Sequence, residues 1–452
     1  MKKILLLLPF AIINLTNAQV CFNTANNFPV SSQAYQTISA DFNGDGKLDL
    51  AVANGSVSIL PGNGAGGFGT ATNFSVSANA NSVCSADFNG DSKADLAVSN
   101  GNTISIVQGT GTGSFGAATN YLLSRAPHSI ITTDLNSDGF YDLAAATQYG
   151  AGNDYVFVLL GTGSGTFNSP DSFPVSGTPT QVIAADLNSD GFKDLLTANY
   201  NGTNVSILLG TGTGSFTAAS PLSTGGQPES LVCADFNTDG FQDVAVVRYN
   251  STSVTIYSGT GGGNFNSTHY DFTVGYDPYS ILAADLNNDG ILDLATANWT
   301  SNNVSVLLGT GLNSYNAFGN AINFAADTLN FSYPVSIMKD DFNGDGKPDL
   351  AVTNKNAKNI SILLNCTGSG IYDHNKKEIS VYPNPSTGQF FIELNTNDQL
   401  NVDLFDHSGR HVLSKCVSDK SNVDITSLND GIYTLTIRTA NQIVTKKLVL
   451  LR

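Results

Sequence analysis

The feature that most constrains the fold of this chain is a ten-residue motif that occurs seven times. The first copy reads "DFNGDGKLDL" and begins at Asp41, and the others follow at intervals of about 50 residues. Each copy marks one structural unit, and internal repeats of this kind decide the architecture of a whole domain. The other six copies begin at Asp87, Asp134, Asp186, Asp235, Asp285 and Asp341.

The residues that follow each motif are typical of short β-strands. An apolar stretch such as "LAVAN" comes first, then an alternating stretch such as "VSILLG", a glycine-rich turn such as "TGTGSF" and a fourth extended segment. Gly, Asn, Ser and Thr are abundant, and they favour turns and strands over helices. Four strands in about 50 residues make one propeller blade, and seven blades close a ring. We therefore predict an all-β chain with a seven-bladed β-propeller over residues 19–366.

The two ends of the repeat array predict how the ring closes. The seventh unit stops after its third strand, "NISILLNC", while the array begins with "CFNTANNFPV", which reads like the missing fourth strand. We expect residues 22–31 to complete the last blade and to bring Cys21 and Cys366 within disulfide distance. The alternative is a pair of free thiols at frayed ends. Cys84 and Cys233 are expected to be small buried residues.

The motif carries the ligand pattern of a calcium loop. Side-chain oxygens stand at positions 1, 3, 5 and 9, a backbone carbonyl is available at position 7, and glycine occupies position 6 in six copies. This is the donor order of an EF-hand-type loop, and its hard oxygens suit Ca²⁺, whereas the absence of His and Cys argues against zinc. We predict up to seven structural Ca²⁺ ions. The predicted ligands are Asp41, Asn43, Asp45, Lys47, Asp49, Asp87, Asn89, Asp91, Lys93, Asp95, Asp134, Asn136, Asp138, Phe140, Asp142, Asp186, Asn188, Asp190, Phe192, Asp194, Asp235, Asn237, Asp239, Phe241, Asp243, Asp285, Asn287, Asp289, Ile291, Asp293, Asp341, Asn343, Asp345, Lys347 and Asp349.

A plain hairpin turn is the alternative interpretation of "NGDG", because Asn-Gly and Asp-Gly are strong hairpin signals. A turn needs the glycine but has no use for three carboxylates, which repel one another without a cation. The loops have no acidic residue at position 12, so we expect weak sites with dissociation constants of about 10⁻⁴ to 10⁻³ M. In the second loop Ser92 replaces the position-6 glycine, where a positive φ would be strained.

Calcium ligands account for most of the formal net charge of -17. Seven Ca²⁺ ions would neutralise most of this charge, so the acidity does not imply a basic partner. We also expect no nucleic-acid partner, because no basic patch is present to neutralise phosphates.

The repeated loop, with its following strands and "GTGSF" turns, resembles the FG-GAP and VCBS-like repeats of the integrin-α type of seven-bladed propeller. The resemblance covers roughly residues 21 to 366. It implies calcium loops on one face, between the first two strands of each blade. It also implies ligand recognition or adhesion more often than catalysis.

The opposite face of the predicted ring varies from blade to blade and is the expected ligand face. Loops between the second and third strands carry Tyr149, Tyr200, Tyr249 and Trp299. Aromatic side chains beside amides suit sugar rings or an extended peptide, so we expect a glycan or protein ligand. The alternative is that these aromatic residues only cap the blade ends. The loops between blades add Tyr35, His128, Tyr276, Tyr279 and Tyr333.

A polysaccharide lyase is the alternative function, because some calcium-containing propellers have this activity. Such an enzyme needs a proton acceptor and cations near a sugar carboxylate. No nucleophile motif or acid pair stands outside the calcium loops, so we expect a binding protein and not an enzyme. Candidate lyase residues on the variable face are Arg125, His128, Arg248, Tyr249 and Lys355.

The two termini carry export signals. Residues 1–18 contain Lys2 and Lys3, a short apolar run and small residues, as a secretory signal peptide does. No other segment is apolar over the length needed to span a membrane. A polar linker, residues 367–376, follows the propeller.

The segment 377–452 alternates short strands with tight turns, which predicts a small immunoglobulin-like β-sandwich. It resembles the type A C-terminal sorting domain of the type IX secretion system of Bacteroidetes. The resemblance implies passage through this secretion machinery and a final place outside the cell or on its surface. An ordinary fibronectin-like accessory domain is the alternative. The matching residues are Tyr382, Pro383, Asn384, Pro385, Gly388, 406–410, 428–433, Lys446 and Lys447.

Overall fold

The computed structural model consists of strands and contains no helix in the residues it describes. Consequently no helix that could cross a membrane is found in that part of the chain. The chain divides into two compact units, Met1–Ser369 and Gly370–Arg452. The predicted signal peptide and most of the predicted linker lie outside the described residues. These are 20–76, 79–147, 154–311, 318–327, 331–367, 380–382, 386–393, 399–406, 410–418, 422–438 and 443–451.

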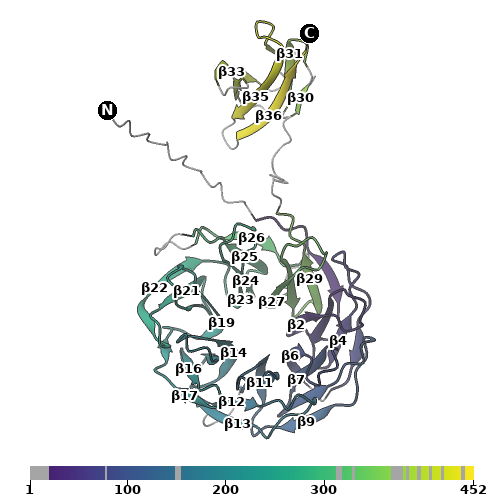
Figure 1. Ribbon diagram of the computed structural model, residues 1–452, viewed down its shortest axis with the longest axis vertical. Helices are drawn as coiled ribbons and strands as arrows, with labels where there is room; N and C mark the ends of the chain where they lie inside the picture. Colours follow the sequence, from purple (N-terminus) through teal and green to yellow (C-terminus); the bar gives the residue numbers. More distant parts are fainter. Residues whose placement is uncertain are drawn as a thin grey trace, which may run out of the picture. The chain divides into compact units, whose positions relative to one another are not determined.

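Seven antiparallel sheets form the first unit, each running from an inner strand at the centre of the ring to an outer strand (Figure 1). The first three blades contain β2 (Gln36–Ala40), β3 (Asp49–Ala53), β4 (Val57–Leu60) and β5 (Thr72–Phe74); β6 (Ala80–Ala86), β7 (Asp95–Asn100), β8 (Thr103–Val107) and β9 (Thr119–Leu122); and β10 (Pro127–Thr133), β11 (Asp142–Thr147), β12 (Asp154–Leu159) and β13 (Asp171–Val175). The next two contain β14 (Pro179–Ala185), β15 (Asp194–Asn199), β16 (Asn204–Gly210), β17 (Phe216–Ala218) and β18 (Leu222–Ser223); and β19 (Pro228–Ala234), β20 (Asp243–Arg248), β21 (Ser253–Gly259) and β22 (Phe265–Thr273). The last two contain β23 (Pro278–Ala284), β24 (Asp293–Asn298), β25 (Asn303–Leu307) and β26 (Ile322–Ala325); and β27 (Pro334–Asp340), β28 (Asp349–Asn354), β29 (Asn359–Leu363) and β1 (Asn26–Pro29).

The inner strands contact one another around a central channel and close the ring. Each of β2, β6, β10, β14, β19, β23 and β27 contacts the inner strands of both neighbouring blades. The second strand of every blade is almost wholly buried, because apolar side chains on both of its sides pack against adjacent blades. For example, Ala51 and Ile59 of the first blade share a core with Val83 and Val98 of the second. The structure therefore confirms the predicted all-β, seven-bladed propeller.

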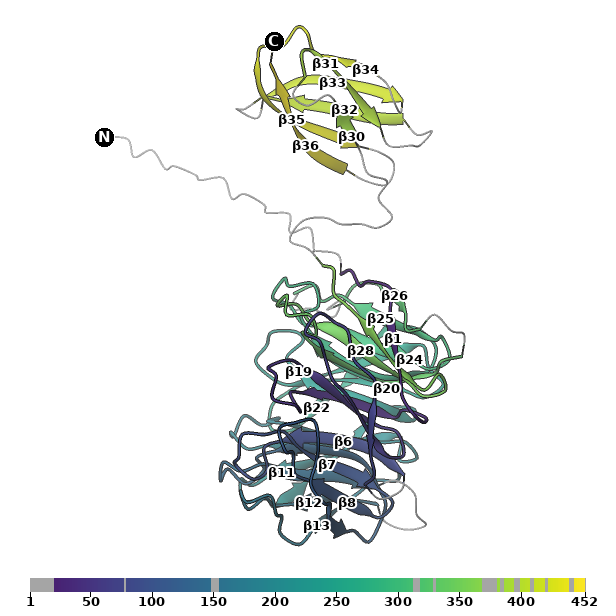
Figure 2. The ribbon, with the colours of Figure 1, turned by 90° about the vertical axis from the view of Figure 1, so that its right-hand side faces the viewer.

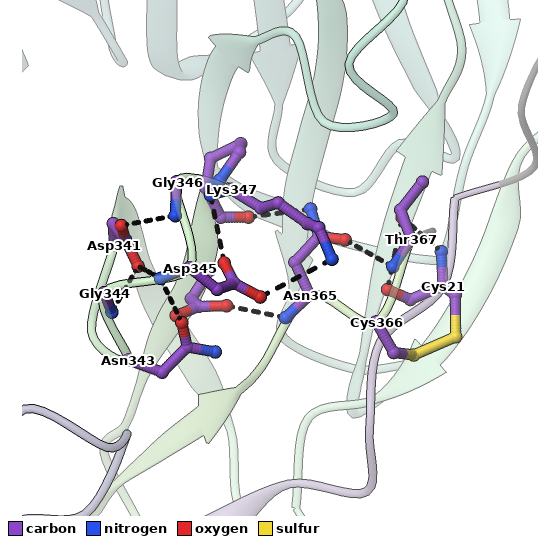
Figure 3. Close-up of polar contacts among 12 residues, drawn as sticks. Cys21, Asp341, Asn343, Gly344, Asp345, Gly346, Lys347, Asn365, Cys366 and Thr367 are labelled. Atoms are coloured by element: carbon purple, nitrogen blue, oxygen red, sulfur yellow. Dashed lines mark hydrogen bonds and ion pairs between the residues drawn. A yellow bond between two sulfur atoms is a disulfide. The ribbon is translucent and has the colours of Figure 1, made fainter. Parts of the chain in front are cut away.

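The N-terminal strand closes the last blade, as the sequence predicts. Strand β1 pairs antiparallel with β29, with Asn26 opposite Ile362 and Pro29 opposite Asn359. Cys21 and Cys366 form a disulfide beside this pairing, across a sequence separation of 345 (Figure 3). The Cys366 N–H also donates to the Cys21 carbonyl at 2.9 Å. The ring is thus joined by a strand pairing and by a covalent bond at the same place.

The second unit consists of two antiparallel sheets on one hydrophobic core (Figure 2). Phe390 and Val423 of the smaller sheet and Leu404, Leu435 and Leu448 of the larger sheet are buried together. Two sheets on one core agree with a β-sandwich, while its immunoglobulin-like character stays a prediction. The sheets are β30 (Ser380–Tyr382), β31 (Gln389–Glu393) and β34 (Asn422–Asp424), and β33 (His411–Ser418), β32 (Gln399–Phe405), β35 (Gly431–Arg438) and β36 (Ile443–Leu450).

Candidate functional site

The acidic loops are folded by hydrogen bonds from their own backbone. In the first loop the Asp41 carboxylate accepts the N–H groups of Gly44 at 2.7 Å and Gly46 at 2.8 Å. Asn43 Oδ1 accepts the N–H of Asp45 at 2.9 Å, and Asp45 Oδ1 accepts that of Lys47 at 3.0 Å. Figure 3 shows the same arrangement in the seventh loop, around Asp341. The side chains at positions 1, 3 and 5 therefore define the turn even without an ion.

The aspartate at position 9 has a second role, which the sequence analysis missed. Asp49 is fully buried, and its carboxylate accepts the N–H of Phe42 at 3.1 Å and that of Gly62 at 2.7 Å. Gly62 belongs to the glycine-rich turn between the third and fourth strands. A Cβ at Gly62 would lie 1.9 Å from the Leu48 carbonyl oxygen, so glycine is required there. Asp49 thus ties the acidic loop to the glycine-rich turn on the same face of the blade.

A glycine N–H bonds the position-9 carboxylate in the next five blades and the Asn365 N–H does so in the seventh, and burial raises the pKa of each position-9 carboxyl group. The pKa of Asp293 rises to about 7, because burial disfavours its charge and the carboxylates of Asp289 and Asp285 repel it. Two N–H donors, from Gly309 and Leu286, only partly offset this rise. The corresponding pKa values of Asp142, Asp243 and Asp349 rise to about 6. Each loop therefore holds more negative charge than its own groups neutralise.

The chemistry of this donor set fits a hard divalent cation. Every side-chain donor at positions 1, 3, 5 and 9 is a carboxylate or amide oxygen. Among the described residues, however, no three His, Cys, Asp or Glu side chains converge in the manner of a formed metal site. The loop oxygens face backbone N–H groups instead. At position 7, Lys47, Lys93 and Lys347 pair with the position-5 aspartates at 3.6, 3.1 and 3.5 Å.

Two positions of each loop require a left-handed backbone. Ser92 has φ of 63°, close to the 79° of Gly46 at the same position in the first loop, as the sequence predicts. Position 4 also has positive φ in every loop, which the sequence analysis did not identify. Its residues are Gly44, Gly90, Ser137, Ser189, Thr238, Asn288 and Gly344.

On the opposite face, one register of the inner strands surrounds the mouth of the central channel. We call these seven residues, which lie six positions before the first aspartate of each motif, the mouth ring. In six blades the ring residue is the extra residue of a β-bulge, which turns its side chain out of the regular pairing. All seven line a cavity of about 550 Å³. They are Tyr35, Asn81, His128, Thr180, Glu229, Tyr279 and Val335.

The next residue of each inner strand is polar, serine in five blades and glutamine in two, and it joins neighbouring blades. Ser82 Oγ accepts the N–H of Ile130 at 3.1 Å, and Ser129 Oγ accepts the N–H of Val182 at 3.2 Å. Gln181 Oε1 accepts the N–H of Leu231 at 2.7 Å. This register is nearly uniform and structural, whereas the mouth ring has almost no two residues alike. Within the inner strands, the variation among repeats is therefore greatest in the mouth ring.

The mouth ring contains two titratable groups that are uncharged near pH 7. His128 donates its Nδ1–H to the Thr180 carbonyl at 3.0 Å, and burial lowers its pKa. Glu229 is 8% exposed, and burial together with the nearby Asp277 carboxylate raises its pKa to about 8. No hydrogen bond or ion pair of the Glu229 carboxyl group is found with the rest of the described chain. The sequence analysis did not identify Glu229, although it is the only glutamate of the propeller.

An aromatic stack borders the mouth ring. The Trp299 ring stacks on Tyr279 and on Tyr333, with distances between ring centroids of 5.4 Å and 4.8 Å. Lys355 Nζ lies 5.4 Å from the ring centroid of Trp299 and 4.9 Å from that of Tyr35. Burial lowers the pKa of Lys355. This group thus combines flat apolar surface with one cation beside the cavity.

The structure places the other predicted ligand residues less centrally. The rings of Tyr200 and Tyr249 lie against each other on the same face, with centroids 5.7 Å apart. Neither ring lines the channel cavity. Tyr149 lies outside the described residues. Arg248 lines a different cavity, where it donates to the Thr224 carbonyl at 2.8 Å. Of the lyase candidates, only His128 and Lys355 line the channel mouth.

Two family models match the chain. The model of the FG-GAP-like repeat matches residues 41–98, 87–145, 134–197, 186–246, 235–296 and 287–352. The model of the secretion system C-terminal sorting domain matches residues 380–451. Both resemblances drawn from the motifs are thereby confirmed. No curated protein is similar in sequence to the chain.

Several solved structures are similar to the propeller. BBS1N in complex with ARL6DN aligns with a TM-score of 0.55 at 14% identity, over 77% of this chain and 98% of that chain. An Agrocybe aegerita lectin that recognises non-reducing terminal N-acetylglucosamine aligns with a TM-score of 0.45 at 20% identity, over 65% and 80%. Rhamnogalacturonan lyase PL11 of Bacillus licheniformis aligns with a TM-score of 0.47 at 13% identity, over 75% of both chains. At such identities the likeness to BBS1N shows the fold alone.

Proposed function

This chain belongs to the FG-GAP-like repeat family, and from that premise we propose that it is a binding protein whose ligand contacts the channel mouth. Its C-terminal sorting domain implies secretion or a place on the cell surface. The observation that carries the proposal is the chemical diversity of the mouth ring. The inner strands are nearly uniform in the register beside the mouth ring, but they differ where their side chains meet around one cavity.

A glycan or a protein is the proposed ligand. Tyr279 lines the cavity and stacks on Trp299, which stacks on Tyr333. Asn81 and His128 offer hydrogen-bonding groups from other blades around the same cavity. Such a mixture of aromatic faces and a few convergent polar groups is typical of ligand sites. We propose recognition without catalysis, because this function needs only the surface described.

We further propose that Ca²⁺ binds the acidic loops and stabilises the face opposite the ligand. Asp, Asn and the position-7 carbonyl of each loop would hold the ion. The oxygen-only donor set and the uncompensated charge of buried carboxylates such as Asp293 support this proposal. A bound cation would relieve that repulsion and would add stability because it binds the folded chain only.

Binding of the full chain to arrays of glycans and of extracellular proteins tests the proposed function. We expect the wild type to retain at least one ligand. Trp299→Ala should weaken binding at least about tenfold, the effect expected of an aromatic anchor. Leu122→Ala is the matched control, because Leu122 is 77% exposed on the outer strand β9 and should leave binding unchanged. Binding that survives Trp299→Ala in a folded variant would place the ligand elsewhere.

A polysaccharide lyase remains the second candidate only through His128, whose neutral ring lies at the mouth with Nδ1 engaged and Nε2 available as an acceptor. Lys355 lies beside the same cavity. Ultraviolet assays on uronic-acid polysaccharides should detect no turnover. Turnover that disappears in His128→Ala would replace binding by catalysis as the function.

A further inference from the structure

Glu229 is the one buried acid of the channel mouth. Its carboxyl group lies in the wall of the cavity, between Thr180 and Tyr279 of the mouth ring, and is 8% exposed. Within the described chain it has neither a hydrogen bond nor an ion pair. The Glu229 oxygens are not among the fully enclosed unpaired atoms of the described chain, so they face the cavity, where a partner from outside the protein can reach them.

The surroundings of Glu229 favour a cation as that partner. The charged group that acts on Glu229 is the Asp277 carboxylate, whose repulsion adds to the effect of burial in raising the Glu229 pKa. Asp277 itself accepts only neutral donors, the N–H of Asn250 and the hydroxyl of Thr300, both at 2.6 Å. The basic groups of the mouth are engaged elsewhere: Lys355 lies over Tyr35 and Trp299, and His128 is uncharged. Two carboxyl groups thus meet on this side of the mouth without a cation.

The channel wall favours a sugar over an extended peptide. A peptide would need free N–H and C=O groups along an inner strand edge. Side chains of the neighbouring blade already occupy N–H groups of these edges, as at Ile130, Val182 and Leu231. The mouth ring instead presents the Asn81 amide and the phenol rings of Tyr35 and Tyr279 around one cavity, which suits a pyranose ring with its hydroxyls.

We propose that the channel mouth binds a glycan with a free amino sugar, whose ammonium group forms an ion pair with Glu229 while the sugar ring contacts the edge of the Tyr279 and Trp299 stack. This inference rests on the proposed binding function and specifies its ligand. The ammonium group would give Glu229 the partner that the protein lacks. It would also lie in the field of Asp277, which favours a cation.

Calorimetry with two sugars that differ only at nitrogen tests the inference. The full chain is titrated with a glucosamine tetramer and with the N-acetylglucosamine tetramer at about pH 6, where the sugar amine is protonated. Glu229 is also protonated in the free protein at this pH, so binding of the ammonium group should release the Glu229 proton to the buffer. We expect the amine form to bind wild type about 30-fold or more tightly, the effect of a buried charge pair. Glu229→Gln should abolish this preference. Asp171→Asn removes an equal charge from the exposed outer strand β13 and should preserve the preference.

Each other outcome overturns the inference and separates it from the proposed function. Equal binding of the two tetramers through Trp299 would leave a glycan site without an ammonium anchor. A preference that persists in folded Glu229→Gln would assign the cation to another group. Binding of oligolysine but of neither sugar would replace the glycan by a protein partner. If wild type binds nothing on the arrays, the proposed function fails as well.

Discussion

At the scale of single residues, this propeller separates two kinds of position. Asp49 and its equivalents are buried, bind two backbone N–H groups and hold each blade together. Glu229 is also buried, at 8% exposure, but its carboxyl group has no hydrogen bond or ion pair in the described chain. The first kind recurs in every blade because each blade needs it. The second occurs once, which is why we assign it to a ligand.

The left-handed residues of the acidic loops make a testable prediction. Ser92→Gly should raise the free energy of unfolding by about 1 kcal/mol, because Ser92 has φ of 63° and glycine adopts that conformation without strain. Gly46→Ser is the matched reverse change, and it should cost about the same. No atom lies within 4 Å of the place that a Cβ at Gly46 would occupy, so only the backbone is tested. Urea unfolding of both variants gives the two values, and equal signs would contradict the prediction.

At the scale of elements, the closure of the ring depends on one short strand. Strand β1 supplies four residues to the last blade, and it comes from the other end of the repeat array. A strand this short gains little from its own ladder. The disulfide between Cys21 and Cys366 beside it keeps the two ends together.

We therefore expect the double variant Cys21→Ser, Cys366→Ser to lose about 2–5 kcal/mol of stability, since the disulfide closes a very long loop in the unfolded chain. Urea unfolding without reductant measures the loss. Dithiothreitol is the control: it should lower the stability of wild type but not of the double variant. Equal unfolding midpoints for wild type and the double variant would show that β1 pairing suffices to close the ring.

At the scale of the whole molecule, the two faces of the propeller carry different kinds of residue. One face carries seven nearly identical acidic loops, joined between blades by contacts such as the N–H of Gly113 to the Phe42 carbonyl at 2.8 Å. The other face carries the mouth ring and the aromatic stack. Calcium on the first face would stiffen the frame that positions the second. The ion would then affect ligand binding only by raising the stability of the folded propeller.

Removal of calcium should lower the melting temperature markedly, and the size of the effect should depend on pH. Folding raises the pKa of the position-9 carboxyl groups, to about 7 at Asp293. The ion-free folded state therefore binds more protons than the unfolded state, and its stability falls as pH rises through about 4 to 7. A cation relieves this loss. The difference in melting temperature between Ca²⁺ and EGTA should be larger at pH 7 than at pH 5, and an unchanged transition in a verified metal-free sample would refute structural calcium.

Much of the fold of this protein was predictable from the sequence, because each blade is formed by one local repeat. Motif spacing, strand patterns and the incomplete seventh unit predict seven blades, the closing strand and the cysteine pair. Sequence analysis also identified the variable face and Trp299 on it, because loops that vary among repeats are visible without coordinates, while its role as a ligand face stays a prediction. Sequence analysis assigned Asp49 and its equivalents to calcium alone. The motif does not reveal that the Asp49 carboxylate also accepts a hydrogen bond from the Gly62 N–H, because Gly62 lies outside the motif.

The sequence by itself thus determined the architecture, because each blade is specified by residues within about 50 positions of one another. Only the tertiary structure decided what the channel mouth is made of. Its seven residues come from seven blades, and Tyr35 and Val335 lie close to opposite ends of the array. Ring closure brings them around one cavity, and β-bulges turn six of them toward it. Their common position, six residues before the first aspartate of each motif, can be counted in the sequence, but only the closed ring shows that these residues meet around a cavity, and so Glu229 became visible only in the folded ring.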